Sequence, residues 1–421
     1  MTQLQSARNR EITEEMKKVA SVEGCTPEHI MDLVSRGLVV IPVNKNHKNV
    51  KPVGIGKGLK VKVNANIGTS SLSSDLENEL KKVDVSREAG ADTIMDLSTG
   101  GDLRAIRRAV LARSDMPVGT VPIYEAVVKL GNPVDLTIEN YLDVFERQAR
   151  EGIDFATVHA GVTMNAIPLL GDRLMGVVSR GGSFLIRWMK KHNEENPLYT
   201  NFDEILKIAR EYDVTMSLGD GLRPGCIHDA TDKAQLHELE ILGELSKRCF
   251  DAGVQVMIEG PGHIPLNQIE KNVRLAKEYC NNAPFYVLGP LPTDIAPGYD
   301  HIVCAIGGAL ACYHGADFLC YVTPKEHVGL PNIEDVREGI IASKIAAHVA
   351  DVARGNFSSM ERDRGMSIAR RNVKWDDMTE FTIDPKRFAE LRLEECKINP
   401  KDNDYCSMCG EFCAIKVYKD E

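Results

Sequence analysis

The feature that most constrains the fold is a unit of helix, glycine-containing turn and apolar strand that recurs along the chain. Four turns show it clearly, and they contain Gly90, Gly152, Gly253 and Gly315. A glycine near a helix end supplies the left-handed cap, and a β-branched run behind it is typical of a buried parallel strand. Strands that alternate with helices in this way predict a parallel sheet with right-handed crossovers.

Nine segments fit the strand pattern: 61–67, 93–96, 117–121, 155–159, 176–179, 214–218, 255–259, 285–288 and 318–322. Segments 203–212 and 234–250 are examples of the amphipathic helices between them. A (β/α)8 barrel of the TIM type has eight strands, so one segment is misassigned or lies outside the barrel. A doubly wound open sheet is the alternative, although no Gly-x-Gly-x-x-Gly follows a strand to support a Rossmann nucleotide site.

The fold class expected is therefore α/β, a (β/α)8 barrel with additions at both ends, because 421 residues exceed what one core usually supports. Residues 1–60 predict a helical lead-in, with helices near 11–20 and 27–37, and then a loop. Residues 61–330 form the barrel. Residues 331–395 predict a C-terminal helical domain with helices over 332–349 and 358–371. Residues 396–421 predict a flexible, cysteine-rich tail.

The charge and hydropathy of the chain exclude several classes of function. A formal net charge of -10 argues against a nucleic-acid partner, because phosphates need a basic face. No apolar run is long enough to span a membrane, and the first residues contain no apolar stretch typical of a secretory signal. We expect a cytoplasmic protein.

The cysteines are distributed unevenly. A cytoplasmic chain with eleven cysteines is not expected to use them as a disulfide framework. Seven are scattered singly, up to Cys320, and are expected to be small buried hydrophobic residues. The other four lie in the last 26 residues: Cys396, Cys406, Cys409 and Cys413.

The last three of these are spaced C-x2-C-x3-C. Three thiolates at this spacing can hold an iron–sulfur cubane and leave one iron open. That open iron could chelate the amino and carboxylate groups of S-adenosylmethionine. A structural zinc knuckle with Cys396 as its fourth ligand is the competing interpretation.

Polar side chains follow nearly every predicted strand. In a barrel the carboxyl ends of the strands form one face, and that face holds the active site. A single polar residue at a strand end is weak evidence, but its recurrence predicts one polar pocket. The candidates include Asn66, Asp96, Tyr124, His159, Asp220, Arg223, Glu259 and Tyr286.

Two further groups of residues suggest ligands. Ser179-Arg180-Gly181-Gly182 offers backbone N–H groups, a hydroxyl and a guanidinium, which suit a phosphate; a plain turn between strand and helix is the alternative. His263 and His327 each follow a carboxylate in the same loop, Glu259 and Glu326 respectively, and could bind a metal through neutral imidazole.

Longer motifs resemble the phosphomethylpyrimidine synthase (ThiC) family over nearly the whole chain. They are VNANIGTS at 63–70, MDLSTGGD at 95–102, GTVPIY at 119–124, VSRGG at 178–182, SLGDGLRPG at 217–225, EGPGH at 259–263 and TDIAPGYDH at 293–301. The gap of three residues between the last two cysteines, and the absence of an N-terminal extension, match a short form of that family.

The resemblance implies a radical S-adenosylmethionine lyase with a 4Fe–4S cluster and zinc. It implies a homodimer in which the tail of one subunit serves the pocket of its partner, and an electron donor of flavodoxin or ferredoxin type. The cluster ligands would be Cys406, Cys409 and Cys413, and the zinc ligands His263 and His327. The substrate contacts would be Asn66, Met95, Tyr124, His159, Ser179, Arg180, Gly181, Asp220, Gly221, Leu222, Arg223, Glu259 and Tyr286.

In this family 5-aminoimidazole ribonucleotide becomes 4-amino-5-hydroxymethyl-2-methylpyrimidine phosphate, the pyrimidine precursor of thiamine. A 5′-deoxyadenosyl radical would abstract hydrogen from the ribose, and Glu259 and Asp220 are the candidates for proton transfer. A paralogous branch makes 5-hydroxybenzimidazole, the lower ligand of an anaerobic cobamide, from the same ribonucleotide. The loop 163–173 is expected to contribute to that difference.

A third alternative belongs to a different class of function. It is a catalytically silent ribonucleotide-binding barrel whose tail holds structural zinc.

Overall fold

A computed structural model of the protein describes residues 1–398 and 406–419. Its contacts divide the chain into two units, Met1–Ala350 and Asp351–Glu421, and each unit is described by itself. The middle of the tail predicted to be flexible, 399–405, lies outside the described residues.

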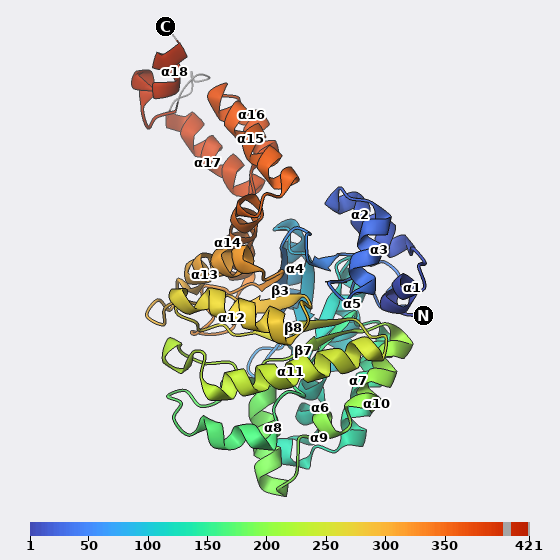
Figure 1. Ribbon diagram of the computed structural model, residues 1–421. Helices are drawn as coiled ribbons and strands as arrows, with labels where there is room; N and C mark the ends of the chain where they lie inside the picture. The colour runs from blue at the N-terminus through green and yellow to red at the C-terminus, as the bar shows by residue number, and fades with distance from the viewer. Residues whose placement is uncertain (399–405, 420–421) are drawn as a thin grey trace. The chain divides into compact units, whose positions relative to one another are not determined.

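The first unit is built around a closed parallel barrel, as the sequence predicts (Figure 1). Each strand pairs in parallel with the next in sequence, and the last strand closes the barrel against the first. The strands are β3 (Lys62–Ile67), β4 (Thr93–Asp96), β5 (Val118–Thr120), β6 (Phe155–Val158), β7 (Thr215–Leu218), β8 (Val256–Gly260), β9 (Phe285–Leu288) and β10 (Phe318–Cys320).

One of the nine predicted strands is wrong, the segment 176–179. Gly176 has a φ of 60°, in the left-handed region that a strand does not adopt. Ser179 is the N-cap of a helix, because its side chain accepts the N–H of Gly182. Val177 and Val178 match the β-branched pattern of a strand, but Val178 is 38% exposed and so does not have the burial of a barrel strand.

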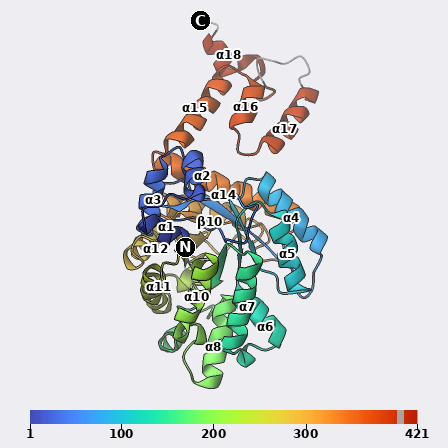
Figure 2. The same ribbon diagram turned by 90° about the vertical axis from the view of Figure 1, so that its right-hand side faces the viewer.

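Helices on the outside connect the strands (Figure 2). Helix α7 shows why they form: Tyr141, Val144, Phe145, Gln148 and Ala149 recur at helical spacing and are all buried against the barrel. The helices of the barrel, with α7 and the short 3-10 turns included, are α4 (Leu76–Glu88), α5 (Leu103–Arg113), α6 (Pro122–Leu130), η1 (Pro133–Asp135), α7 (Ile138–Glu151), η2 (Met164–Leu170), α8 (Arg180–His192), α9 (Pro197–Thr200), α10 (Phe202–Tyr212), η3 (Ile227–Asp229), α11 (Lys233–Asp251), α12 (Leu266–Tyr279) and α13 (Asp300–His314).

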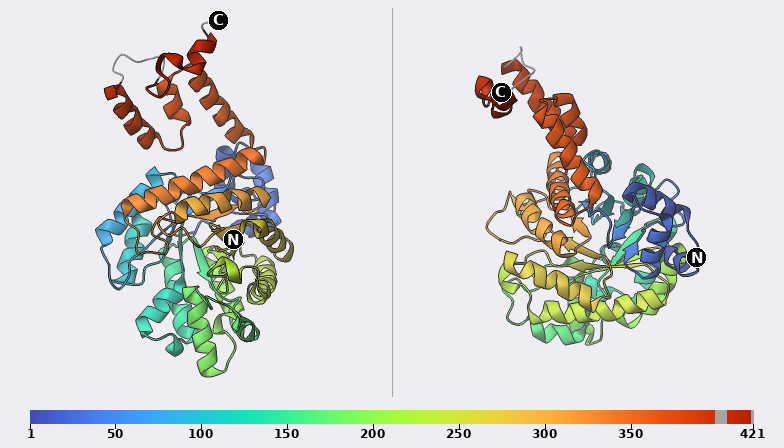
Figure 3. Two further views of the ribbon diagram at one scale, coloured as in Figure 1. Left: turned by 90° about the vertical axis from the view of Figure 1, so that its left-hand side faces the viewer. Right: turned by 45° about the horizontal axis from the view of Figure 1, so that its top comes forward.

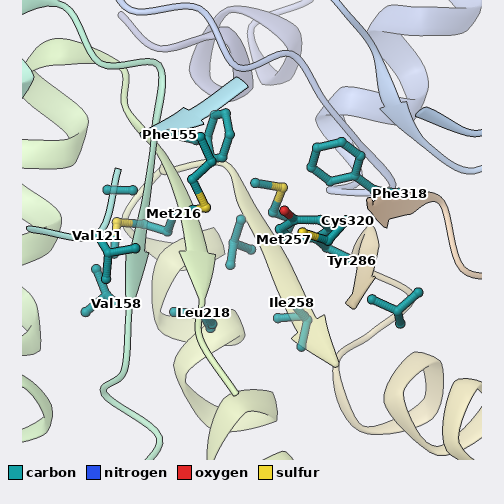
Figure 4. Close-up of a cluster of buried hydrophobic side chains, with 14 of the residues drawn as sticks. Val121, Phe155, Val158, Met216, Leu218, Met257, Ile258, Tyr286, Phe318 and Cys320 are labelled. Carbon is teal, nitrogen blue, oxygen red and sulfur yellow. The ribbon is translucent and has the colours of Figure 1, made fainter. Parts of the chain in front are cut away.

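Large side chains fill the inside of the barrel (Figure 4). The rings of Tyr286 and Phe318 stack with centroids 4.2 Å apart. Gly119 leaves room for a neighbouring ring, because a Cβ there would lie 2.1 Å from Phe155. A filled barrel is not a pore, so a ligand must bind at one of its ends.

The N-terminal segment occupies the amino end of the strands. The hydroxyl of Thr2 donates to the carbonyl of Gly253 at 2.6 Å, and Gln255 accepts the N–H of Ile41 at 2.7 Å. Gly253 and Gln255 directly precede β8, so this segment leaves the carboxyl end free. It contains α2 (Glu14–Glu23) and α3 (Pro27–Ser35), which confirm the two predicted helices. It also contains α1 (Gln3–Arg8) and a small sheet of β1 (Val39–Val40) and β2 (Ile55–Gly56), which were not predicted.

Helix α14 (Ile333–Ala353) runs from the first unit into the second (Figure 3). The second unit continues with α15 (Phe357–Arg371), α16 (Trp375–Phe381), α17 (Pro385–Ile398), η4 (Gly410–Phe412) and α18 (Ala414–Lys419). The helices predicted over 332–349 and 358–371 are confirmed. Among residues 1–398 and 406–419, no helix is long and apolar enough to cross a bilayer.

Candidate functional site

A cavity of about 280 Å³ lies at the carboxyl end of the barrel strands. Every strand of the barrel, or the segment directly after it, contributes a side chain to its wall. The wall is made of Asn66, Met95, Leu97, Val121, Tyr124, Thr157, His159, Val178, Arg180, Asp220, Arg223, Glu259, Gly260, Tyr286, Val287, Leu288, Cys320 and Glu326. The prediction that polar strand ends converge in one pocket is confirmed.

Nine of the thirteen predicted substrate contacts line this cavity, and the other four are Ser179, Gly181, Gly221 and Leu222. These four are chain neighbours of lining residues, since Ser179 and Gly181 flank Arg180 at the start of α8, and Gly221 and Leu222 lie between Asp220 and Arg223. A Cβ on Gly181 would lie 2.4 Å from Nδ1 of His159, so only glycine allows the two to approach.

Glu259 is held as a hydrogen-bond acceptor in the floor of the cavity. Its Oε1 accepts the hydroxyls of Thr157 and Ser217, both at 2.7 Å. Burial raises the pKa of Glu259, and the two hydroxyls and Arg223 oppose that shift. A carboxyl group in this state can accept a proton from a substrate or bind a substrate amine.

Asp220 is held differently, by a guanidinium. Nη1 of Arg223 lies 3.1 Å from its Oδ1, whereas Oδ2 is buried without a hydrogen-bond partner in the protein. Burial raises the pKa of Asp220 to about 7, against the opposing effect of Arg223 and with a contribution from Glu259. Asp220 can therefore exchange a proton near neutral pH.

The amino end of α8 brings a cation to the cavity. Arg180 is the first residue of that helix, and its guanidinium lies 4.7 Å from the ring centroid of Tyr124. Free backbone N–H groups and the helix dipole add to the positive potential there. The arrangement suits a phosphate group, as the sequence suggests.

His159 is a neutral residue in this site. Burial and Arg223 lower its pKa to about 3, so the imidazole is uncharged at neutral pH. Its Nδ1 is buried without a hydrogen-bond partner in the protein. It can hydrogen-bond a ligand but cannot act as a cationic acid.

Sequence reasoning missed Cys320, which it treats as an ordinary buried hydrophobic residue. The amide of Asn66 donates to its sulfur at 2.9 Å, and burial raises the pKa of the thiol to about 12. Cys320 is the last residue of β10, so the strand-end rule could have identified it. Thr157 was also missed, whereas Glu326 belongs to the polar strand ends that were expected to converge and does line the cavity.

His263 and His327 come together although 64 positions separate them in the sequence, since their ring centroids are 5.1 Å apart. Nδ1 of His263 lies 2.8 Å from Asp294, and Nδ1 of His327 lies 3.0 Å from Asp300. A carboxylate on Nδ1 leaves Nε2 available to a metal. The orienting carboxylates are therefore not Glu259 and Glu326, which line the cavity instead.

These two histidines supply two metal ligands at most. In the ranges 1–398 and 406–419, no group of three or more histidine, cysteine, aspartate and glutamate side chains is arranged to hold a metal ion. A metal at this pair would take its other ligands from water or substrate.

The loop 163–173 contacts the residues around the cavity. Arg173 pairs with Asp232 and donates a hydrogen bond to the carbonyl of Leu222 at 2.6 Å. Leu222 belongs to the loop that carries Asp220 and Arg223. The loop 163–173 can therefore influence the cavity through that backbone.

The three clustered cysteines lie on a turn-rich loop of the second unit. None is in a disulfide, and Cys409 is exposed. The carbonyl of Cys406 accepts the N–H of Gly410 at 3.1 Å, and that of Cys413 accepts the N–H of Val417 at 2.9 Å. The number and spacing of these free thiols suit an iron–sulfur cubane, although their side chains, all within the described range 406–419, are not gathered into a three-ligand group in this structure.

Comparisons with known proteins agree over the full chain. The family described as the radical SAM ThiC family matches residues 2–420. A protein named phosphomethylpyrimidine synthase from Carboxydothermus hydrogenoformans is 57% identical over 426 residues, covering 100% of this chain and 99% of that protein. Proteins of the same name are 55% identical in Thermoanaerobacter sp. (100% and 98% covered) and 53% in Methanococcus aeolicus (100% and 99% covered).

Proposed function

Because this chain belongs to the radical SAM ThiC family, we propose that it is the lyase that makes the thiamine pyrimidine. It converts 5-aminoimidazole ribonucleotide to 4-amino-5-hydroxymethyl-2-methylpyrimidine phosphate. The observation that carries this proposal is the family match over residues 2–420, together with relatives that share more than half of its residues. The cavity that gathers the family motifs at one barrel end supports it.

The residues of the cavity bind and orient the ribonucleotide. Arg180 and the N–H groups that begin α8 hold the phosphate, and neutral His159 donates or accepts one hydrogen bond. Glu259 and Asp220 bind substrate amines or move protons, because burial raises the pKa of both. When bound, the 4Fe–4S cluster with S-adenosylmethionine supplies the radical that starts the rearrangement.

Cys406, Cys409 and Cys413 are the proposed cluster ligands. Three thiolates leave one iron for the amino and carboxylate groups of S-adenosylmethionine. The enzyme needs an electron for each radical it forms, so it has an electron donor, which we propose to be a flavodoxin or a ferredoxin.

We propose zinc as the ion held by His263 and His327. The support is their 5.1 Å centroid separation and the two aspartates that fix the imidazoles. Zinc binds neutral imidazole and, in catalytic sites, keeps positions open for water or substrate.

We further propose a cytoplasmic homodimer. Its support is the family resemblance and an apolar face on α13, where Ile302, Ile306 and Tyr313 are each about half exposed. These residues recur at helical spacing, and an exposed apolar stripe is typical of an interface.

The other candidate functions are not favoured. The relatives that are 53–57% identical are named phosphomethylpyrimidine synthase, which is against the 5-hydroxybenzimidazole branch. Membership of a radical SAM family is also against a catalytically silent barrel with structural zinc.

Anaerobic turnover tests the proposal. The reconstituted protein is incubated with aminoimidazole ribonucleotide, S-adenosylmethionine and a reductant, and the products are identified by mass spectrometry. A phosphorylated pyrimidine is expected. An unphosphorylated benzimidazole, or consumption of S-adenosylmethionine without either product, would contradict the assignment.

A further inference from the structure

A second, much smaller cavity of about 20 Å³ lies directly behind the substrate cavity. Asp220, Arg223, Glu259 and Gly260 line both cavities, so these residues form the wall between them. The far side of the small cavity is made by α11 and α12. Its lining there includes Gln235, Glu238, Leu239, Leu242, Asn272 and Ala276.

Glu238 is the acidic residue on that far side. It is 2% exposed and lies on the inward face of α11. Its Oε2 accepts the N–H of Leu222 at 2.7 Å, so it holds the backbone of the loop that carries Asp220 and Arg223. The contact is close, because a Cβ on Gly221 would lie 3.2 Å from the other carboxyl oxygen, Oε1.

Two oxygen atoms of this wall are buried without a hydrogen-bond partner in the protein, Oδ2 of Asp220 and Oε1 of Glu238. Both residues line the small cavity. A buried polar atom without a partner costs about 1–3 kcal/mol, so such atoms usually bind internal water. A cavity needs roughly 10–15 Å³ to hold one water molecule, which this one provides.

The charges around the pair favour a single shared proton. Burial raises the pKa of both carboxyl groups, and the charge of Asp220 raises the pKa of Glu238 further, whereas the backbone N–H groups of Leu222 and Gly221 lower it. Arg223 opposes the shift of Asp220 and Glu259 adds to it, while Arg173 weakly opposes the shift of Glu238. Two buried carboxyl groups that line one small cavity are costly to ionise together, which favours one proton between them.

We propose that Glu238 is a positioning residue of the site that shares one proton with Asp220 through a water molecule held in the small cavity. The proton on Oε1 of Glu238 passes to the water as the water passes one of its own to Oδ2 of Asp220. One O–H bond breaks and one forms at each step, and nothing is oxidised or reduced. The role of Asp220 toward substrate rests on the function proposed above, whereas the shared proton does not.

A purely structural alternative is an ionised Glu238 that only anchors the loop. Both roles need an acceptor for the N–H of Leu222, so loss of stability does not separate them. They differ in whether Glu238 carries a proton at neutral pH.

Infrared difference spectroscopy of the full-length protein, without substrate, measures that proton. The carbonyl stretch of a protonated carboxyl group is compared in the unchanged protein, in Glu238→Gln, which keeps the acceptor, and in Glu240→Gln. Glu240 is exposed on the same helix and provides the matched control. Other buried carboxyl groups such as Asp213 contribute equally to all three spectra, so the band should lose intensity in Glu238→Gln and keep it in Glu240→Gln.

A band of unreduced intensity in Glu238→Gln would overturn the proposal, and so would a band missing from the unchanged protein. If Glu238→Gln lacks a cooperative thermal transition, labelling only the glutamates with carbon-13 gives the answer without a variant. Part of the band must then shift, and a band in which nothing shifts rejects Glu238.

Turnover adds an independent measurement. Glu238→Gln should lower kcat about tenfold with KM little changed, because one partner in proton exchange is lost and the loop is kept. A rise in KM alone would show an anchor and overturn the shared proton. Failure of the unchanged protein to make any product would contradict the proposed function but leave the infrared result standing.

Discussion

At the scale of single residues, the cavity holds two carboxyl groups in different environments. Glu259 accepts two hydroxyl groups, whereas Asp220 meets one guanidinium and keeps an oxygen without a protein partner. Hydrogen bonds from neutral donors favour the ionised carboxylate without adding charge. Groups in one pocket that are held differently can take different protonation states, as acid–base chemistry requires.

This difference can be tested at Thr157. Thr157→Val removes one hydroxyl from Glu259, which raises the pKa of that carboxyl group further. The acid limb of kcat/KM should move to higher pH by up to about one unit, because ionised Glu259 is lost sooner as the pH falls. Thr120→Val is the control, because that buried hydroxyl donates to Gln148 instead. An acid limb of kcat/KM that is unchanged in Thr157→Val would show that the ionisation of Glu259 does not control the reaction.

The paired histidines give a second prediction at this scale. His263→Ala or His327→Ala should lower bound zinc greatly without removing iron, because half of the protein ligands are lost. Asp294→Asn should weaken zinc binding by about 10–100-fold, since Asp294 orients His263 without being a ligand itself. Metal content of the purified variants checks both. If both alanine variants keep their full zinc content, the two histidines do not bind the metal and have only a structural role.

Part of the site could be predicted from single residues. His159, Asp220 and Glu259 follow from the rule that barrel strands end at the active site, and the structure places all three in the cavity. Asp294 and Asp300 could not be paired with their histidines, because only the folded chain brings them into contact. The position of Cys320 at a strand end was the one signal for it in the sequence, whereas the amide of Asn66 that contacts its sulfur comes from another strand and appears only in the folded chain.

At the scale of elements, eight of the nine expected strands were correct because helix, turn and strand recur in the same order along the chain. The segment 176–179 was wrong because two valines imitate a strand, whereas Gly176 and Ser179 adopt turn and cap geometry. Helix α1 was missed because Gln3–Arg8 is short and has little amphipathic pattern. It is held by contacts with distant residues, which a local pattern does not contain.

Asp213 gives a prediction about how α1 is held. Its carboxylate accepts the N–H of Gln3 at 2.8 Å, and burial raises its pKa to about 7. The folded protein therefore binds a proton that the unfolded chain, with a pKa near 4, has released. Stability contributed by this residue falls as the pH rises from about 4 to 7. Asp213 also has a φ of 58°, which asparagine tolerates well.

Asp213→Asn should accordingly stabilise the protein more at pH 8 than at pH 5. Asparagine keeps the acceptor and cannot ionise, and the gain at pH 8 is on the order of 1–3 kcal/mol. Urea unfolding followed by circular dichroism at both pH values measures it. Asp143→Asn, at an exposed position on α7, should give the same change at both. Equal effects of Asp213→Asn at pH 5 and pH 8 would contradict the raised pKa.

At the scale of the whole molecule, the residues proposed for the chemistry are divided between two units of the chain. The cavity with Glu259 belongs to Met1–Ala350, and the three clustered cysteines belong to Asp351–Glu421. A variant can therefore remove the cluster without touching the barrel, or disable the cavity without touching the cysteines. This separation allows the proposed homodimer to be tested by activity.

Cys409→Ser and Glu259→Ala should each be inactive alone, the first without a complete cluster and the second without its carboxyl group. If the tail of one subunit serves the pocket of its partner, a mixed dimer contains one intact pair and one pair that is doubly defective. Random exchange of equal amounts then restores about a quarter of the unmutated activity, because half of the dimers are mixed and each has one working site. If each tail serves its own pocket, both pairs in a mixed dimer are defective and activity stays at zero. Anaerobic turnover before and after subunit exchange distinguishes the two, and mixing each variant with itself gives the baseline.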